Sequence, residues 1–360
     1  MPVREDRVSD ELFYKTLRMV SPGTPLHEGL ESILRARTGA LIVIGDSEEV
    51  MSLVNGGFRI DAELNPAALY ELAKMDGAII LSSDAKRILY ANTQLTPNPL
   101  IPTVETGTRH RTAERVARQT GALVISISQR RNVITVYKGS FRYMLRDVSV
   151  VLAKANQALS TLEKYKAVLQ QVLNNLSALE FEDLATLYDV TICIQRSQMV
   201  ARIVREIERY VAELGTEGRL VNMQLEELLV DVKDQGDLVV KDYYVEGVET
   251  PENVLQTLES WSSEELLDLT LIARALGYGA QAANLDAPVT PRGYRMLSKI
   301  PRLPATVIEN LVQSFKRFPS IDEASITELD QVEGIGEVRA HAIKDGLRRL
   351  REHVLLDRHV

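Results

Sequence analysis

The feature that most constrains this chain is a long stretch without proline between residues 148 and 248. Leucines recur there at roughly helical spacing among Glu, Lys and Gln, as in the series Leu152, Leu159, Leu162, Leu169, Leu173 and Leu176. Spacing of this kind places apolar side chains on one face of an α-helix. We therefore expect long helices, broken once at residues 215–218 and followed by another helical pair after Pro251. An apolar stripe is usually a packing surface, so we predict spacing and association for this region and assign it no chemistry.

The region before residue 148 shows a different pattern, in which short apolar runs alternate with amphipathic segments. Strands are expected at 40–44, 78–82, 87–91, 122–128 and 133–137, and helices at 12–20, 26–35, 67–75 and 113–119. Residues 83–86 are typical of a hairpin turn, and residues 92–105 of a polar loop that contains prolines. The pattern predicts a mixed α/β domain, with a central sheet and flanking helices.

The composition is that of an ordinary globular protein. The chain has 360 residues, of which 45% are hydrophobic and 26% charged, so two or three domains are expected. No apolar run approaches the roughly 18–20 residues that span a bilayer, and the charged first ten residues lack the apolar core of a signal peptide. The single cysteine, Cys193, excludes an internal disulfide and fits a reducing compartment. We expect a cytoplasmic protein with no membrane partner.

A polar cluster at residues 106–112 is the first candidate for binding chemistry. It reads Thr-Gly-Thr-Arg-His-Arg-Thr, which combines three hydroxyls, two arginines, a histidine and a glycine. Hydroxyls and backbone N–H groups donate to phosphate oxygens, and arginines add bidentate charge-assisted bonds. The helix expected directly after it would place the cluster at a helix N-terminus, which also favours phosphate. From composition alone, a solvated basic turn is the alternative.

The last part of the chain carries a second kind of phosphate-binding pattern. Residues 332–340 read Val-Glu-Gly-Ile-Gly-Glu-Val-Arg-Ala, between helical patterns at 325–331 and 338–350. This Gly-x-Gly turn resembles a helix–hairpin–helix, in which glycines let backbone N–H groups approach a phosphate. Such a module contacts the DNA backbone without reading sequence, whereas a turn used only for packing is the alternative. The candidate DNA-binding residues are Gly334, Gly336, Arg339, Lys344 and Arg348.

Residues 299–304 look like a first, degenerate copy of this hairpin, with prolines in place of glycines. From Pro291 onward the chain has 12 Lys and Arg against 10 Asp and Glu, although its formal net charge is −8 overall. DNA contact would therefore come from a local basic face rather than from bulk attraction. Residues 286–291 have the composition of a linker. We predict an α/β domain at 1–148, an all-α spine at 149–286, and an all-α helix–hairpin–helix domain at 287–360.

A third motif, Asp76-Gly77-Ala78, joins a helix to an apolar strand about thirty residues before the basic cluster. These two motifs at this spacing, with the segments 70–75 and 90–95, a helical spine and a C-terminal helix–hairpin–helix, resemble the DNA-integrity scanning diadenylate cyclases. The resemblance covers essentially the whole chain. It implies a nucleotidyltransferase that condenses two ATP molecules into cyclic di-AMP and two pyrophosphates with Mg²⁺ or Mn²⁺. It also implies a homo-octamer.

The same resemblance assigns roles to individual residues. Asp76 matches the acidic residue near the ribose 3′-hydroxyl and the metal, Gly77 and Ala78 lie beside the nucleotide, and Leu95 lies against the adenine. The triphosphate is matched to Thr108, Arg109, His110, Arg111 and Thr112, of which Arg109 and His110 share the catalytic role with Asp76. Ser128 is matched to a phosphate or metal-side contact. Gln129 departs from the glutamate that relatives often carry there.

Regulation by DNA is implied as well. Branched DNA similar to a Holliday junction, bound at the C-terminal domains, would lower cyclase activity, and the protein would associate with the nucleoid. Cyclisation of two ATP molecules needs two sites face to face, so a monomer cannot perform it. One rival is a non-catalytic nucleotide-binding DNA-repair scaffold. Another is a structure-specific nuclease, which is disfavoured because no carboxylate cluster suited to a two-metal site stands out in the sequence.

Overall fold

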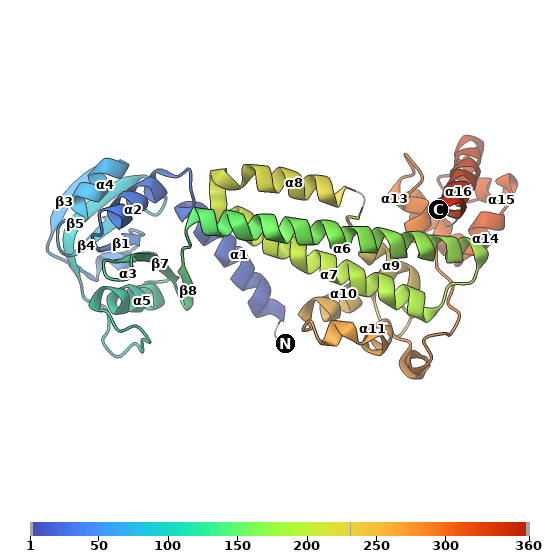
Figure 1. Ribbon diagram of the computed structural model, residues 1–360, viewed down its shortest axis with the longest axis horizontal. Coiled ribbons are helices and arrows are strands. Elements are labelled where there is room, and N and C mark those ends of the chain that lie inside the picture. Colours follow the sequence, from blue (N-terminus) through green and yellow to red (C-terminus); the bar gives the residue numbers. More distant parts are fainter. Residues whose placement is uncertain (1–2, 231, 358–360) are drawn as a thin grey trace. The chain divides into compact units, whose positions relative to one another are not determined.

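A computed structural model describes residues 3–230 and 232–357 (Figure 1). The chain divides into two compact units: Met1–Gln157 with Ile207–Met223, and Ala158–Glu206 with Gln224–Val360. Helices α6 (Val148–Glu182) and α7 (Leu187–Leu214) each contribute residues to both units. The domain boundaries proposed from the sequence stay predictions.

The first unit is built around one mixed β-sheet. Over the described residues its strands are β1 (Ala40–Ile44), β2 (Val54–Asn55), β3 (Phe58–Glu63), β4 (Ala78–Leu81), β5 (Arg87–Leu95), β6 (Leu123–Ser128), β7 (Val133–Lys138) and β8 (Phe141–Met144). The strand order is β2-β5-β4-β1-β6-β7-β8, and β3 pairs with β5. β1 and β4 are parallel, and the other pairs are antiparallel. The predicted mixed α/β domain, including the hairpin between β4 and β5, is confirmed.

Helices cover both faces of this sheet. Successive side chains of a strand point to opposite faces, and β1 divides its residues between two cores accordingly. Ala40, Ile42 and Ile44 pack with α1 (Val3–Val20), α2 (Pro25–Arg35) and α4 (Pro66–Leu72). Leu41 and Val43 pack with α3 (Glu48–Met51) and α5 (Thr108–Thr120). Burial on both faces explains why β1 is a continuous apolar run.

Two element boundaries differ from the prediction in ways that affect the site. α5 begins at Thr108 rather than at 113, because Gly107 is its N-cap and the Arg111 N–H donates to the Gly107 carbonyl at 2.9 Å. The loop predicted at 92–105 is wrong for residues 92–95, which extend β5. Asn92 adopts a φ of 52°, and a register shift against β4 accommodates this bend.

The described part of the second unit is helical, which confirms the prediction of a helical region after the α/β domain. After the shared α6 and α7 its elements are α8 (Arg219–Leu229, begun in the first unit), α9 (Gln235–Tyr243), α10 (Pro251–Ser260), α11 (Leu269–Ala275), α12 (Tyr294–Ser298), α13 (Ala305–Phe315), α14 (Phe318–Glu323), α15 (Ile326–Asp330) and α16 (Glu337–Asp357). Helix α13 ends at Phe315, because Lys316 has a φ of 66°.

Buried charges fix α12 against α6 and α9. The Asp242 carboxylate accepts the backbone N–H groups of Gly293 and Tyr294 at 2.7 Å and of Arg295 at 3.0 Å. The fully buried Arg295 guanidinium pairs with Glu180. A carboxylate is favoured at a helix N-terminus, and a buried arginine needs a paired carboxylate because an unpaired buried charge is costly. This network therefore fixes the start of α12.

Candidate nucleotide-binding site

The two N-terminal motifs meet at one edge of the sheet. β1 and β4 are parallel and begin at this edge, and β6, antiparallel to β1, ends there at Ser128. α5 begins over the same edge, so that Arg109 Nη2 lies 3.7 Å from Asp76 Oδ1. A Cβ atom on Gly39, just before β1, would lie 2.2 Å from Arg109 Nη1 and 3.3 Å from the Ile127 carbonyl oxygen. The fold therefore brings together Asp76, Arg109 and the end of β6.

Gly77 has a structural reason to be glycine. Its φ is 91°, and a Cβ there would lie 2.7 Å from the Thr93 carbonyl oxygen and 2.9 Å from the carbonyl carbon of Asn92. The backbone of β5 thus leaves no room for a side chain at this turn. The Thr93 hydroxyl also donates to the Ala78 carbonyl at 3.0 Å. The turn places the Asp76 side chain fully in solvent, where a nucleotide or a metal ion can reach its carboxylate.

The basic cluster forms the first turn of α5. Gly107 has no side chain with which to cap the helix, so the first-turn N–H groups are available to an anion. Thr108 and Arg111 are exposed, and Thr112 is half-buried. The predicted placement of this cluster at a helix N-terminus is confirmed, although the roles of its residues stay predictions.

Three residues that the sequence motifs did not point to hold His110. The Tyr137 hydroxyl donates to Glu105 Oε1 at 2.8 Å, Arg142 Nε donates to the same oxygen at 2.7 Å, and His110 Nδ1 lies 2.9 Å from the Tyr137 oxygen. Burial opposes ionisation of Glu105, but the hydrogen bonds from Tyr137 and Arg142 lower its pKa overall. Burial and the bond to Glu105 raise the pKa of Tyr137. At neutral pH the pair is therefore a carboxylate and a phenol.

The segment before α5 is anchored by that helix. The Thr103 hydroxyl donates to the buried carboxylate of Glu114, which also pairs with Arg118 at 2.6 Å. Arg115 Nε donates to the Ile101 carbonyl at 3.0 Å. Leu100, directly before Ile101, is exposed. The i, i+4 pair of Glu114 and Arg118 was the available sequence signal, but it did not reveal that the glutamate is buried.

The remaining N-terminal site residues lie near the same edge without contacting Asp76. Leu95, predicted to lie against the adenine, ends β5 two residues beyond Thr93 and is buried in the core shared with α5. The Ser128 hydroxyl accepts the Arg131 N–H at 3.2 Å. Gln129 beside it is exposed. The structure assigns Ser128 a turn-forming bond, and its contact with phosphate stays a prediction.

The donor set at this edge fits a metal that arrives with its nucleotide. No three His, Cys, Asp or Glu side chains in the described ranges form a group that could hold a metal ion. Asp76 instead offers one solvent-facing carboxylate. Mg²⁺ bound to nucleotides typically takes one or two carboxylates, several waters and the substrate phosphates. One carboxylate is therefore sufficient for an ion that the triphosphate also holds.

The predicted DNA-binding turn joins α15 and α16. Gly334 has a φ of 83°, and a Cβ there would approach Val307 Cγ2 at 3.6 Å. At Gly336 a Cβ would meet nothing within 4 Å, and its φ is not positive. Gly334 is therefore required by the turn itself, whereas the conformation of Gly336 does not require glycine.

The predicted basic residues on α16 differ in how far their charges are available to a ligand such as DNA. Arg339 Nη1 donates to the Gly334 carbonyl at 2.5 Å and so braces the turn. Lys344 Nζ donates to the Asp322 carbonyl at 2.6 Å and ties α16 to α14. Arg348 is exposed and forms an i, i+3 pair with Asp345. Arg339 and Arg348 are exposed, whereas Lys344 is half-buried.

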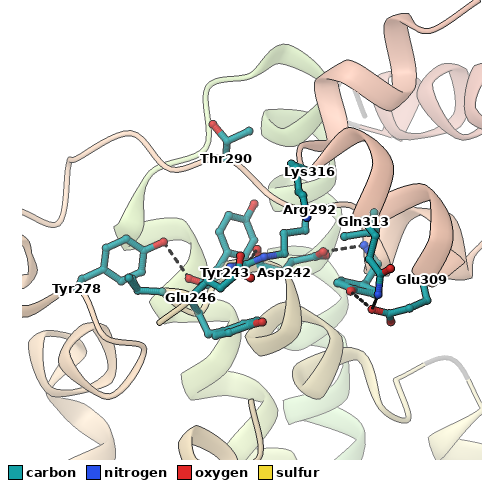
Figure 2. A pocket seen from close by; sticks show the side chains of 13 residues that line it. Asp242, Tyr243, Glu246, Tyr278, Thr290, Arg292, Glu309, Gln313 and Lys316 are labelled. Carbon is teal, nitrogen blue, oxygen red and sulfur yellow. Dashed lines mark hydrogen bonds between the residues drawn. The ribbon is translucent and has the colours of Figure 1, made fainter. Parts of the chain in front are cut away.

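A separate pocket of about 440 Å³ lies in the second unit and is shown in Figure 2. Its polar groups are mostly satisfied within the protein. Arg292 donates from Nη1 to the Asp242 carbonyl at 3.0 Å and from Nη2 to the Tyr244 carbonyl at 2.8 Å, and Glu309 accepts from Tyr294 at 2.9 Å. None of the predicted site residues lines it. The candidate site is thus the open edge of the sheet and not this pocket.

Comparison with known proteins decides the family. The model described as "DisA bacterial checkpoint controller nucleotide-binding" matches residues 27–141, and the corresponding "linker region" model matches 145–285. The chain is 63% identical to the DNA integrity scanning protein DisA of Carboxydothermus hydrogenoformans, over 96% of this chain and 98% of that protein. This chain belongs to the DisA family. The sheet edge at Asp76, the basic cluster and α5 all lie within the residues that the DisA nucleotide-binding model matches.

Other DisA proteins are also similar to this chain over almost its whole length. The DisA protein of Clostridium botulinum is 58% identical over 97% of this chain and 98% of its own length, and that of Clostridium perfringens is 59% identical over 98% and 99%. Among solved structures, DacA from Staphylococcus aureus matches 39% of this chain and 89% of its own at 19% identity and a TM-score of 0.29, values too low to carry an argument. Among the helices described, none is both long and apolar enough to cross a membrane.

Proposed function

We propose that this DisA-family protein is a diadenylate cyclase that converts two ATP molecules into cyclic di-AMP and two pyrophosphates. The observation that supports this most is the meeting of Asp76 with Arg109, 3.7 Å apart, where α5 begins over the sheet edge. One solvent-facing carboxylate beside an anion-binding helix terminus is suited to a nucleotide with its metal ion. The match of this region to a nucleotide-binding family model points the same way.

The proposed chemistry follows from these side chains. In each half-reaction a ribose 3′-oxygen forms a bond to the α-phosphorus of the other ATP, the bond to pyrophosphate breaks, and the hydroxyl proton is released to solvent. Asp76 would hold Mg²⁺ or Mn²⁺, which supplies neutralisation of phosphate charge and a lower pKa of the attacking hydroxyl. Arg109, Arg111 and the first-turn N–H groups of α5 would bind the triphosphate and stabilise the departing pyrophosphate.

The reaction also requires a second copy of the chain. Each site holds one ATP, so ring closure needs two sites that face each other and present both nucleotides in line. We propose a homo-octamer in which such facing sites are paired. The exposed, shallow position of Asp76 supports this arrangement, because a partner's nucleotide can approach an open edge more easily than a closed cleft.

The C-terminal turn supports a DNA-binding role. A glycine-containing turn precedes a 21-residue helix with basic residues, and a helix–hairpin–helix of this kind would hold phosphates by backbone N–H groups. We propose that branched DNA bound there lowers cyclic di-AMP synthesis, which would place the protein at the nucleoid. If saturating Holliday-junction DNA leaves the rate of synthesis unchanged, this coupling is wrong.

Incubation with ATP and Mg²⁺ or Mn²⁺, followed by chromatography, tests the cyclase. We expect cyclic di-AMP from the native chain, and a loss of turnover on the order of 10²-fold in Asp76→Asn. Asp84→Asn is the matched control, because Asp84 is an exposed aspartate at the other end of β4. It should keep full activity.

The same assay separates the cyclase from its rival. A folded protein that binds ATP but forms no dinucleotide would be a nucleotide-binding scaffold. Equal activity of Asp76→Asn and Asp84→Asn would remove Asp76 from the mechanism. Thermal unfolding of each variant shows whether the fold is intact, so that a loss of activity can be assigned to chemistry.

A further inference from the structure

Donor and acceptor roles in the network around His110 are fixed by its chemistry. The Glu105 carboxylate can only accept, and it takes hydrogen bonds from both Tyr137 and Arg142. Tyr137 has one hydroxyl proton, which is used on Glu105. Its oxygen therefore accepts from His110, at 2.9 Å. It follows that Nδ1 of His110 carries a proton, whether the ring is neutral or charged.

The other ring nitrogen has no hydrogen-bond partner within the part of the chain that the structure describes. His110 Nε2 is buried and makes no hydrogen bond with the described residues. A buried polar atom without a partner costs free energy, and a bound ligand is one kind of group that can satisfy such an atom. The ring atom next to it, Cδ2, lies 3.6 Å from the position that a Cβ on Gly107 would occupy. This edge of the imidazole therefore borders the helix N-cap, where an anion would bind.

His110 faces charged side chains on each of the elements packed against it. Burial lowers the pKa of the ring most, Glu105 in the preceding segment raises it, and the positive charges of Arg131, Arg142 and Arg109 lower it further. The ring is therefore neutral near pH 7 in the free protein, with a lone pair on Nε2. A fully ionised phosphate offers only acceptors, so it can bond to Nε2 only after this atom gains a proton.

We propose that Glu105 and Tyr137 are positioning residues that hold His110 with its Nδ1–H directed to Tyr137, and that the polyphosphate of the bound nucleotide is the partner of Nε2. Nucleotide binding is then coupled to the uptake of a proton from solvent by this imidazole. The new charge is balanced on one side by the phosphate and on the other by the Glu105 carboxylate, through the Tyr137 hydroxyl. This inference rests on the proposed nucleotide site and adds a proton linkage to it.

Titration calorimetry with 3′-deoxy-ATP and Mg²⁺ tests the coupling in the full-length protein. This probe lacks the attacking hydroxyl, so it cannot react and cannot place a ribose 3′-hydroxyl on Nε2. Near pH 7 the binding enthalpy should vary with the ionisation enthalpy of the buffer, with a slope that approaches one proton taken up per nucleotide. In His110→Gln the slope should fall to near zero, because glutamine does not titrate.

Tyr137→Phe separates positioning from simple packing. It removes one oxygen and should lower the proton uptake by at least half and weaken binding about tenfold, because the imidazolium loses its link to Glu105. Glu105→Gln, which keeps the shape and removes the charge, should act in the same direction if Tyr137→Phe does not fold. The matched control is Tyr143→Phe, since Tyr143 donates to Glu213 at 2.8 Å and accepts from Arg146 at 2.9 Å in a comparable network. It should leave proton uptake unchanged.

The outcomes distinguish this inference from the proposed function. Binding of 3′-deoxy-ATP without any buffer dependence would overturn the proton coupling and leave nucleotide binding intact. Proton uptake that persists in His110→Gln would place the proton on another group and overturn it as well. Equal effects of Tyr137→Phe and Tyr143→Phe would show that Tyr137 is not a specific positioning residue. Absence of binding by the native protein would overturn both proposals.

Discussion

At the scale of single residues, the fold depends most on the buried charge of Arg295. Its guanidinium pairs with Glu180, and both side chains are fully buried. Replacement by an apolar side chain leaves the Glu180 carboxylate buried without its cationic partner, although the Tyr243 hydroxyl still donates to it at 2.8 Å. We expect Arg295→Met to lower the free energy of unfolding of the helical unit by about 3–5 kcal/mol. The single tryptophan, Trp261, lies in that unit, and its fluorescence during denaturant unfolding reports the transition.

The double variant Glu180→Met with Arg295→Met supplies the control for this prediction. It removes both charges, and replacement of a buried pair by apolar residues of similar volume is often close to neutral. We therefore expect it to recover most of the stability lost in Arg295→Met. If the double variant is less stable than the single variant, the loss comes from packing, from the bond to Ser177 or from the buried Tyr243 hydroxyl that loses Glu180 as its acceptor, and not from an unpaired charge.

The sequence predicted which residues form the site better than it predicted what each of these residues contacts. Asp76 and Arg109 belong to short motifs whose chemistry is visible in the sequence, and the structure places them 3.7 Å apart. Tyr137, in contrast, occupies an ordinary apolar strand pattern, and Glu105 lies in a polar segment without a periodic signal. Tyr137 meets His110 because β7 packs against α5, and Glu105 joins this network through the Tyr137 hydroxyl. Local sequence does not encode such tertiary packing. The roles of the motif residues in catalysis stay predictions.

At the scale of elements, the turn between α15 and α16 offers a comparison between two glycines. Gly334 has a positive φ that an L-residue adopts with strain, whereas a side chain at Gly336 would meet no protein atom. We expect Gly334→Ala to destabilise the C-terminal helices by about 1–2 kcal/mol, measured by thermal unfolding. Gly336→Ala should leave stability within about 0.5 kcal/mol of the native value, as for most surface substitutions.

DNA binding, unlike stability, should be sensitive to a side chain at residue 336. If backbone N–H groups of the turn contact phosphate, a methyl group at residue 336 would obstruct that approach. We expect Gly336→Ala to weaken binding of a Holliday junction severalfold in a mobility-shift assay while the fold is unaffected. Unchanged affinity of the Gly336→Ala variant would show that the turn serves packing only.

The elements themselves were predictable where burial imposed a pattern. The runs at β1, β4 and β6 are buried on both faces, and the long helices show regular apolar spacing, so both were predicted. β3 was missed although Phe58, Ile60 and Ala62 alternate with charged residues, and its burial in the structure is low. β5 was cut short at residue 91, because its polar continuation resembles a loop and its bend depends on the register with β4. Tertiary pairing overrides local propensity in such strands.

At the scale of the whole molecule, an α/β region followed by a helical region was readable from sequence, but the assembly was not. The residue pattern changes near residues 148 and 286, and these changes suggested the boundaries between regions. The two family models meet between residues 141 and 145. In the single chain the sheet edge at Asp76 is open, and the proposed function requires a second copy to face it. The consequence of facing sites can nevertheless be tested through the products that mixed assemblies form.

We expect mixtures of native and Asp76→Asn chains, co-assembled by unfolding and refolding together, to release a linear dinucleotide. A facing pair with one functional carboxylate can complete one attack, which forms one phosphodiester bond and releases one pyrophosphate. The second attack, which closes the ring, needs the carboxylate of the other site. As the fraction of Asp76→Asn rises, cyclic di-AMP per native chain should fall in proportion to the chance that both members of a pair are native, and the linear product should rise in parallel. Chromatography of the products measures both, and constant cyclic di-AMP per native chain would show that one site performs both attacks without a partner.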